Sequence, residues 1–218
     1  MLATAVLIVR PRPQERARSS RLGESIALIR REPRLAAYLL IVAVVGFASD
    51  PVNALAPAFA NEFGHAATVG GFLLGVFGAG AVTAAFVVAG RTAGSRRRMA
   101  ATLGLLSGGM ILFALTPWLP VALLFLFVAG FGYLASNTSA TSRLQLEVSE
   151  AQRGRVMALW GIAFLGVRPF ASLIDGAIAS AAGVRVAGVV LALPALAVGV
   201  AIALRGRQRA VRDYLVDS

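Results

Sequence analysis

Long apolar stretches, separated by short polar breaks, fill most of the chain. A helix needs about 20 mostly apolar residues to cross the roughly 30 Å of hydrocarbon in a bilayer. The pattern predicts six such transmembrane helices, at residues 35–60, 69–90, 100–117, 119–142, 156–183 and 186–204. The expected fold is therefore all-α: a polytopic membrane protein whose six-helix bundle occupies residues 35–204 and leaves no room for a soluble domain.

The segments that flank this bundle are shorter and more polar. Residues 1–9 are apolar and are followed at once by "RPRPQERAR", without the basic start or the cleavage site of a signal peptide. We interpret them as the end of a preceding transmembrane helix. Residues 10–34 are predicted to be a cytoplasmic linker with a short amphipathic helix on the membrane surface, although a solvated linker helix fits the same spacing. Residues 205–218 are predicted to be a cytoplasmic tail.

The charges indicate how the bundle is oriented. All 21 basic residues are arginines, and nineteen of them lie in four segments that alternate with three arginine-poor loops. Cytoplasmic loops carry the excess of basic residues in membrane proteins, so both ends of the six-helix unit are expected in the cytoplasm. The net charge of +11 thus reflects membrane topology and not nucleic-acid binding. Arginine without lysine, in a chain rich in alanine and glycine, is typical of a GC-rich bacterial genome and suggests the bacterial inner membrane.

Catalysis is not expected from the residues present. The chain has no cysteine and a single histidine, His65, which falls in a predicted outer loop. No cluster of His, Asp or Glu has metal-ligand spacing, and no glycine-rich stretch ends in the Lys and Ser or Thr of a phosphate-binding loop. We therefore predict neither an enzyme nor a bound metal or cofactor.

Three ionisable residues lie inside predicted spans, where such groups are costly and mark a pathway, a relay or a pair. Counted along the helices, Arg168 lies past the middle of the membrane, and Asp50 and Asp175 lie nearer the outer surface. Arg168 and Asp175 are seven residues apart and so share a helix face. Pro169 lacks a backbone donor, which frees a carbonyl beside Arg168 and favours a bend there.

Several roles stay open for these polar residues. Arg168 is either a structural strut paired with Asp175 or Asp50, or a cavity or gate residue, or a side chain that reaches the outer surface. Asp50, close to Asn53, is either a proton carrier or a residue of an outer vestibule. Asn137, near the cytoplasmic end of the fourth span, either lines an inner opening or forms the more common hydrogen bond between helices.

Small residues four apart form pairs that share a helix face in the second and third spans. Such pairs let helix backbones approach closely in lipid. They indicate either general packing of the bundle or an interface that moves during gating. The pairs are Gly71 with Gly75, Gly80 with Ala84, and Gly104 with Gly108.

One long passage resembles a known family. "RLQLEVSEAQRGRVMALWGIAFLGVRPFASLIDGAIASAAGVR" is similar to the region of the fifth and sixth helices in the C-terminal half of major facilitator superfamily transporters, especially the enterobactin-exporter-like branch of drug and siderophore efflux proteins. "LGESIALIRREPRLAAYLL" and "APAFANEFGHAATVGGFLLGVFGAGAV" resemble that family's central cytoplasmic helix with its seventh span, and its seventh and eighth spans. The residues that match the branch are Gln145, Arg153, Gly154, Arg155, Val156, Gly166, Pro169, Ser172 and Gly176.

The resemblance implies a half-transporter. Members of the superfamily hold substrate between two six-helix halves, and residues 20 to 204 resemble the second half only. The resemblance also implies proton-driven efflux of small lipophilic or siderophore-like molecules by alternating access. The expected partners are the lipid bilayer, the substrate, protons, and an N-terminal half from the same or another chain or a second copy. A truncated, non-transporting remnant or a regulatory membrane subunit is the alternative. The transport-pathway candidates are Asp50, Asn53, Asn137, Arg168 and Asp175, and the gating or structural candidates are Arg153, Arg155, Pro169 and Gly176.

Overall fold

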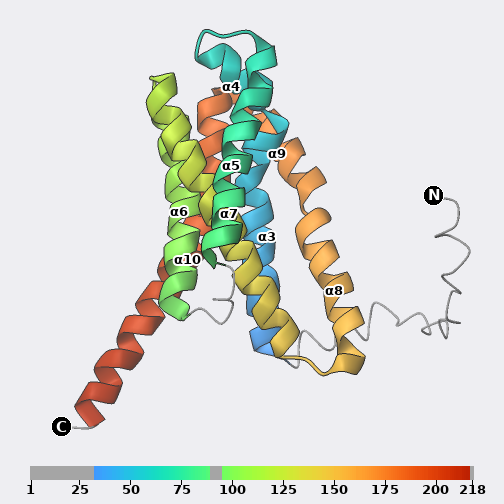
Figure 1. The fold of residues 1–218 in the computed structure, drawn as a ribbon, viewed down its shortest axis with the longest axis vertical. Coiled ribbons are helices and arrows are strands. Elements are labelled where there is room, and N and C mark those ends of the chain that lie inside the picture. The colour runs from blue at the N-terminus through green and yellow to red at the C-terminus, as the bar shows by residue number, and fades with distance from the viewer. Residues whose placement is uncertain (1–31, 89–94, 217–218) are drawn as a thin grey trace, which may run out of the picture.

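The computed structural model describes residues 32–88 and 95–216, and throughout these ranges every regular element is a helix (Figure 1). Six stretches are long and apolar enough to cross a membrane, which confirms the predicted all-α polytopic fold. The helices are α3 (Pro33–Ala54), α4 (Ala56–Glu62), the 3-10 helix η1 (Ala67–Val69), α5 (Gly70–Val88), α6 (Arg96–Leu115), α7 (Leu119–Leu146), α8 (Glu150–Leu165), α9 (Arg168–Ala182) and α10 (Val184–Val216).

Two of the predicted spans are each divided into two helices. The span predicted at 35–60 breaks at Leu55, between α3 and α4, and the span predicted at 156–183 breaks between α8 and α9. In both cases a proline, Pro57 or Pro169, occupies the first turn of the second helix. Proline is well tolerated at that position but cannot donate to the preceding turn. The distortion expected at Pro169 is confirmed as an interruption of the helix at Gly166 and Val167, both of which keep right-handed helical backbone angles.

Of the predicted flanking segments, only the C-terminal one lies largely within the described residues. Residues 1–9 and nearly all of the linker 10–34, with its expected amphipathic helix, lie outside the described residues. At the other end, α10 continues without interruption to Val216. The segment predicted as a separate tail is thus, as far as Val216, an extension of the last transmembrane helix.

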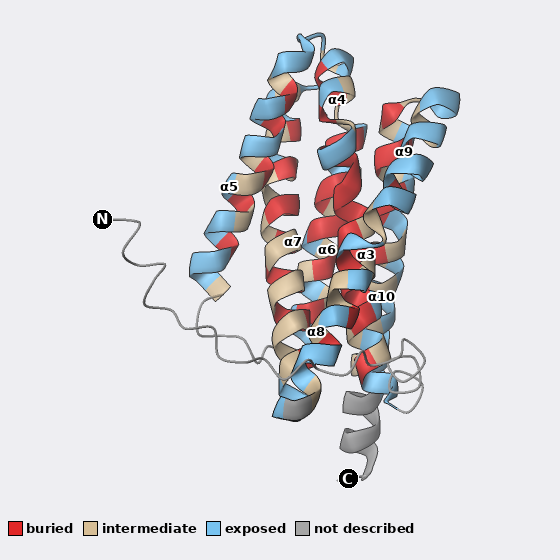
Figure 2. Cartoon of the chain, turned by 90° about the vertical axis from the view of Figure 1, so that its right-hand side faces the viewer, coloured by how far each residue is buried: buried red, intermediate tan, exposed pale blue. Residues whose placement is uncertain are grey.

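Helix α3 forms the centre of the bundle. It packs against α5, α6, α7, α8, α9 and α10, and buried residues run along most of its length (Figure 2). In its most apolar window 67% of the residues are buried, against 17% for the span formed by α8 and α9. This span has the smallest buried share of the six.

Glycines bring α5 and α7 into close backbone contact. A Cβ atom at Gly80 would collide with the carbonyl oxygen of Phe127, and one at Gly130 would collide with that of Phe77. The other predicted glycine pairs do not serve this purpose, because a Cβ atom added at any of them would meet nothing within 4 Å. Close packing is therefore observed for Gly80 with Ala84, both of which are buried. The backbone of Gly104 lies near Gly199 of α10, and a moving interface stays a prediction for the other glycines.

The two ends of the bundle differ in charge. Helices α3 and α6 begin, and α7 ends, at the lower end in Figure 1, where α10 leaves the bundle. Arg34, Arg96, Arg143 and Arg205 lie at this end. Arg185 lies at the opposite end, just after Gly183, whose φ of 95° turns the chain from α9 into α10. The arrangement agrees with the predicted alternation of loops, and the cytoplasmic position of the arginine-rich end stays a prediction.

Candidate functional site

Two buried aspartates meet where α3 packs against α9. Asp50 is 2% exposed and Asp175 is fully buried. The hydroxyl of Ser172, one turn before Asp175 on α9, donates a hydrogen bond of 2.6 Å to Oδ2 of Asp50. Asp50 is thus enclosed in this conformation, and its role as a proton carrier or as a residue of an outer vestibule stays a prediction. Sequence reasoning found both acids but not the contact, because 122 residues separate Asp50 from Ser172.

Asp175 lacks any hydrogen-bond partner in the described part of the chain. Both of its carboxylate oxygens are buried and unsatisfied by any described residue, and the carboxylate of Asp50 repels it. An ionised carboxylate buried without a partner costs several kcal/mol, and a second carboxylate nearby adds repulsion. A proton or another cation that neutralised part of this charge would lower the cost of burying the pair.

Arg168, the first residue of α9, is half-buried and lies against an aromatic ring. Its guanidinium carbon is 5.1 Å from the centroid of the Phe164 ring, and the same group interacts with the hydroxyl of Tyr133 on α7. It attracts Asp50 electrostatically, but among the described residues it forms no ion pair within 4.0 Å with either aspartate. The interpretation as a fixed strut paired with Asp175 or Asp50 is therefore not supported by the geometry.

An aromatic row supports Arg168 and runs from α8 to α5. Trp160 and Phe164 stack at 5.1 Å between centroids, Phe164 lies 6.3 Å from Tyr133, and Tyr133 lies 5.3 Å from Phe77. Nε1 of Trp160 and Nε of Arg168 are buried and have no hydrogen-bond partner in the part of the chain that the structure describes. Sequence reasoning missed this row, although Trp160, Phe164 and Arg168 recur every four residues and so predict a shared face across the break.

The other two transport-pathway candidates are asparagines, and neither takes part in the contact between α3 and α9 described above. Asn53 is exposed, and its Nδ2 donates a hydrogen bond of 2.7 Å to the carbonyl of Ser49 in its own helix. Asn137 is half-buried one turn from Tyr133, and its Oδ1 has no partner among the residues described.

The gating candidates are mostly exposed. Arg153 and Arg155 lie on the surface of α8 and form no ion pair with any described residue. Gly176 is exposed with open space where a Cβ atom would lie, and Pro169 starts α9. The structure thus brings together Asp50, Asp175 and, at longer range, Arg168.

Comparison with known families gives this arrangement its context. A family model described as Major Facilitator Superfamily matches residues 1–164 and residues 38–214. The chain belongs to the major facilitator superfamily. No match was found among curated proteins or among solved structures. Membership makes the protein a multi-pass membrane protein of a transporter family.

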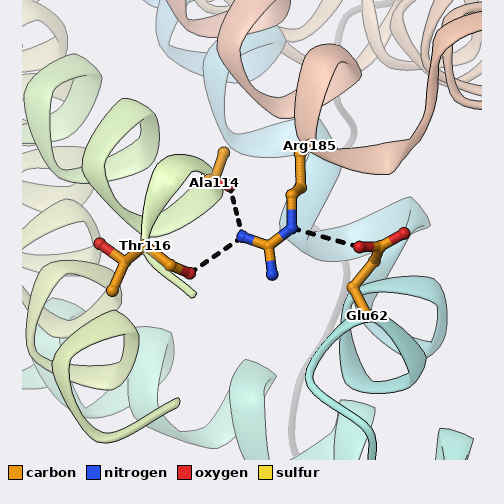
Figure 3. A network of polar contacts seen from close by, with 4 residues as sticks. All are labelled: Glu62, Ala114, Thr116 and Arg185. Carbon is orange, nitrogen blue, oxygen red and sulfur yellow. Dashed lines mark hydrogen bonds and ion pairs between the residues drawn. The ribbon is translucent and has the colours of Figure 1, made fainter. Parts of the chain in front are cut away.

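This superfamily member also has a polar network at its arginine-poor end (Figure 3). Arg185 donates from Nη1 to the carbonyls of Ala114 and Thr116, both at 2.9 Å, and from Nε to Glu62 at 3.2 Å. The two carbonyls belong to the last turn of α6 and its cap, where helical partners are missing. Arg185 therefore ties α4, the α6–α7 turn and α10 together, a role that was not apparent from its place in an arginine-poor loop.

Proposed function

We propose that this protein is one six-helix half of a secondary transporter that exports small lipophilic or siderophore-like molecules in exchange for protons, by alternating access. Family membership supports transport. The single observation that carries proton coupling is Asp175, fully buried with both carboxylate oxygens unsatisfied and with Asp50 as its neighbouring charge. In the enterobactin-exporter-like branch that the sequence resembles, substrate and coupling sites lie between two such halves.

Proton exchange follows from the difference between buried and hydrated states of this pair. While Asp175 is enclosed between α3 and α9, a bound proton removes the charge that burial penalises. When the site opens to water, the ionised form is hydrated and the proton leaves. Each opening and closing of the α3–α9 contact is thereby linked to the release and uptake of a proton.

The helix break supplies the required mobility. Helix α9 is separated from α8 at Gly166 and Val167, and the span formed by these two helices is the least buried of the six. Hinges are commonly found at such element ends. A small rotation of α9 about this break moves Ser172 and Asp175 away from Asp50 without unfolding either helix.

Arg168 takes the role of a mobile counter-charge in this proposal. It is attracted to Asp50 but in this conformation lies on the ring of Phe164. Once the aspartates lose their proton, their negative charge attracts the guanidinium of Arg168 more strongly, and it moves toward them. The aromatic faces of Trp160 and Tyr133 beside it are suited to lipophilic substrates, since an apolar wall with few polar groups binds such compounds.

The test is dye efflux from reconstituted vesicles under an imposed pH gradient, with the chain alone and with a candidate N-terminal half. We expect gradient-driven efflux of a lipophilic dye by the native chain in one of these formats. Asp175→Asn should reduce it to the level of protein-free vesicles, because the amide cannot exchange a proton. Glu150→Gln, the same change at an exposed site on α8, is the matched control and should keep it.

Protein content and melting temperature separate loss of function from loss of folding. Asp175→Asn replaces an acid that must bind a proton to be buried without charge by an amide that is always neutral, and it is expected to keep or raise the melting temperature. Arg168→Ala should abolish efflux at an unchanged amount of membrane protein, whereas loss of the folded protein would identify a strut. Efflux by Asp175→Asn that still follows the pH gradient would refute proton coupling at this residue, and absence of efflux in every format would favour a non-transporting subunit.

A further inference from the structure

A cavity of about 650 Å³ opens at the arginine-rich end of the bundle, away from the aspartate pair. It lies between the beginnings of α3 and α6 and the ends of the membrane-spanning parts of α7 and α10. Four arginines, one from each helix, contribute to its lining together with one acid: Arg34, Arg96, Arg143, Arg205 and Glu147.

Two arginines of this cavity have no acidic partner among the described side chains. Glu147 is 3.8 Å from Arg34, whose side chain is 76% exposed, so this ion pair is weak. Arg96 and Arg205 form no ion pair with any residue whose side chain the structure describes. These two arginines alone place two positive charges on a single concave surface, which attracts an anion.

The wall beneath the arginines is apolar. Ile41 and Met99 are 5% and 4% exposed, and Ile202 is half-buried beside them. A small, hydrated anion would contact the arginines only. A molecule with a charged head and a hydrocarbon chain would contact both the arginines and this wall, and the cavity lies at the helix ends, where headgroups meet the hydrocarbon of a bilayer.

We propose that this cavity binds a phosphate group, presented by an anionic phospholipid whose first acyl carbons lie against Ile41, Met99 and Ile202. Guanidinium groups match phosphate in planar, two-point hydrogen bonding. Basic pockets between transmembrane helices bind lipid headgroups of this kind. The bound lipid joins α3, α6, α7 and α10 at one end of the bundle, and this role does not depend on what the protein transports.

The experiment titrates the purified full chain, in neutral detergent, with fluorescent phosphatidylglycerol. The site variant is Arg96→Gln with Arg205→Gln, and both residues are exposed, so folding should be kept. Its matched control is Arg97→Gln with Arg98→Gln, which removes the same charge from the same end of the bundle at exposed positions outside the cavity. At about fivefold in affinity per arginine, we expect about 25-fold weaker binding for the site variant and less than about threefold for the control.

Two further titrations identify the source of the phosphate. Phosphatidylcholine should bind much more weakly than phosphatidylglycerol. Glycerol phosphate at millimolar concentration should not displace the fluorescent lipid, because it lacks the chain that contacts the apolar wall; displacement with the same dependence on Arg96 and Arg205 would keep the phosphate site but assign it to a soluble ligand. Equal loss of lipid binding in the site and control variants, or equal binding of phosphatidylcholine, would overturn the proposal.

Discussion

Replacing Arg185 tests whether the arginine-poor end of the bundle is held by one side chain. Its guanidinium makes two hydrogen bonds to backbone carbonyls, one to Ala114 and one to Thr116, and an ion pair with Glu62. It also lies 5.1 Å from the centroid of the Phe63 ring. Arg185→Gln removes the charge and the branched donor arrangement, and Arg185→Lys keeps the charge while losing the two-sided donor geometry.

The size of the effect follows from these contacts. Hydrogen bonds from a charged donor contribute about 1.5–3 kcal/mol each, and water replaces part of this because the Arg185 side chain is 28% exposed. The Glu62 side chain is 44% exposed, so its ion pair adds about 0–1 kcal/mol, and the ring contact adds about 0.5–1 kcal/mol. We expect Arg185→Gln to lower the free energy of unfolding by about 2–4 kcal/mol and Arg185→Lys by about 1–2 kcal/mol.

The measurement is unfolding by sodium dodecyl sulfate in mixed micelles, followed by far-ultraviolet circular dichroism. Glu62→Gln is the internal control, because it removes the ion pair and leaves both bonds to the backbone. It should lower the unfolding free energy by less than about 1 kcal/mol. If Glu62→Gln is as destabilising as Arg185→Gln, or if Arg185→Lys is neutral, the backbone carbonyls are not what Arg185 stabilises and the reasoning fails.

The same unfolding assay checks the glycine contacts. Gly130→Ala should destabilise the bundle by about 3 kcal/mol or more, because its methyl group would collide with the backbone of Phe77. Gly75→Ala, which meets open space, should be neutral or up to about 1 kcal/mol more stable, and equal effects would contradict the assigned contact. Pro169→Ala restores a backbone donor at the break between α8 and α9 and should slow vesicle efflux while leaving stability unchanged or higher; unaltered efflux would count against a hinge there.

The six spans were predictable because lipid imposes one strong rule on sequence. A spanning segment must be apolar and must satisfy its own backbone, so length and hydropathy largely determine it. The breaks within two spans were less visible, since Pro57 and Pro169 lie inside apolar runs that hydropathy reads as continuous. Proline chemistry predicts a distortion at such positions, but whether it bends or ends the helix depends on packing.

The candidate site was predictable residue by residue but not as an arrangement. Asp50, Arg168 and Asp175 stand out because a charge in lipid is costly. Their partners come from other helices, so the Ser172 contact and the absence of a close Arg168 ion pair could not be read from spacing. The spacing of small residues could not predict helix packing for the same reason. It defines one face of a helix but does not show which neighbouring helix, if any, packs against that face.

The central position of α3 has a consequence for how the protein is made. The first described helix to leave the ribosome carries Asp50, and the serine that bonds to it is synthesised 122 residues later. At about 5–20 residues per second, translation leaves this acid without its partner for roughly 6–24 s. During that interval α3 carries a polar group that disfavours its insertion, at a cost below the roughly 2.5–3.5 kcal/mol of a charge at the helix centre, because Asp50 lies nearer the end of the span. We therefore expect α3 to be held by the insertion machinery or by a neighbouring helix until α9 arrives, and changes that delay α9 should first be detected as degradation of newly made chains.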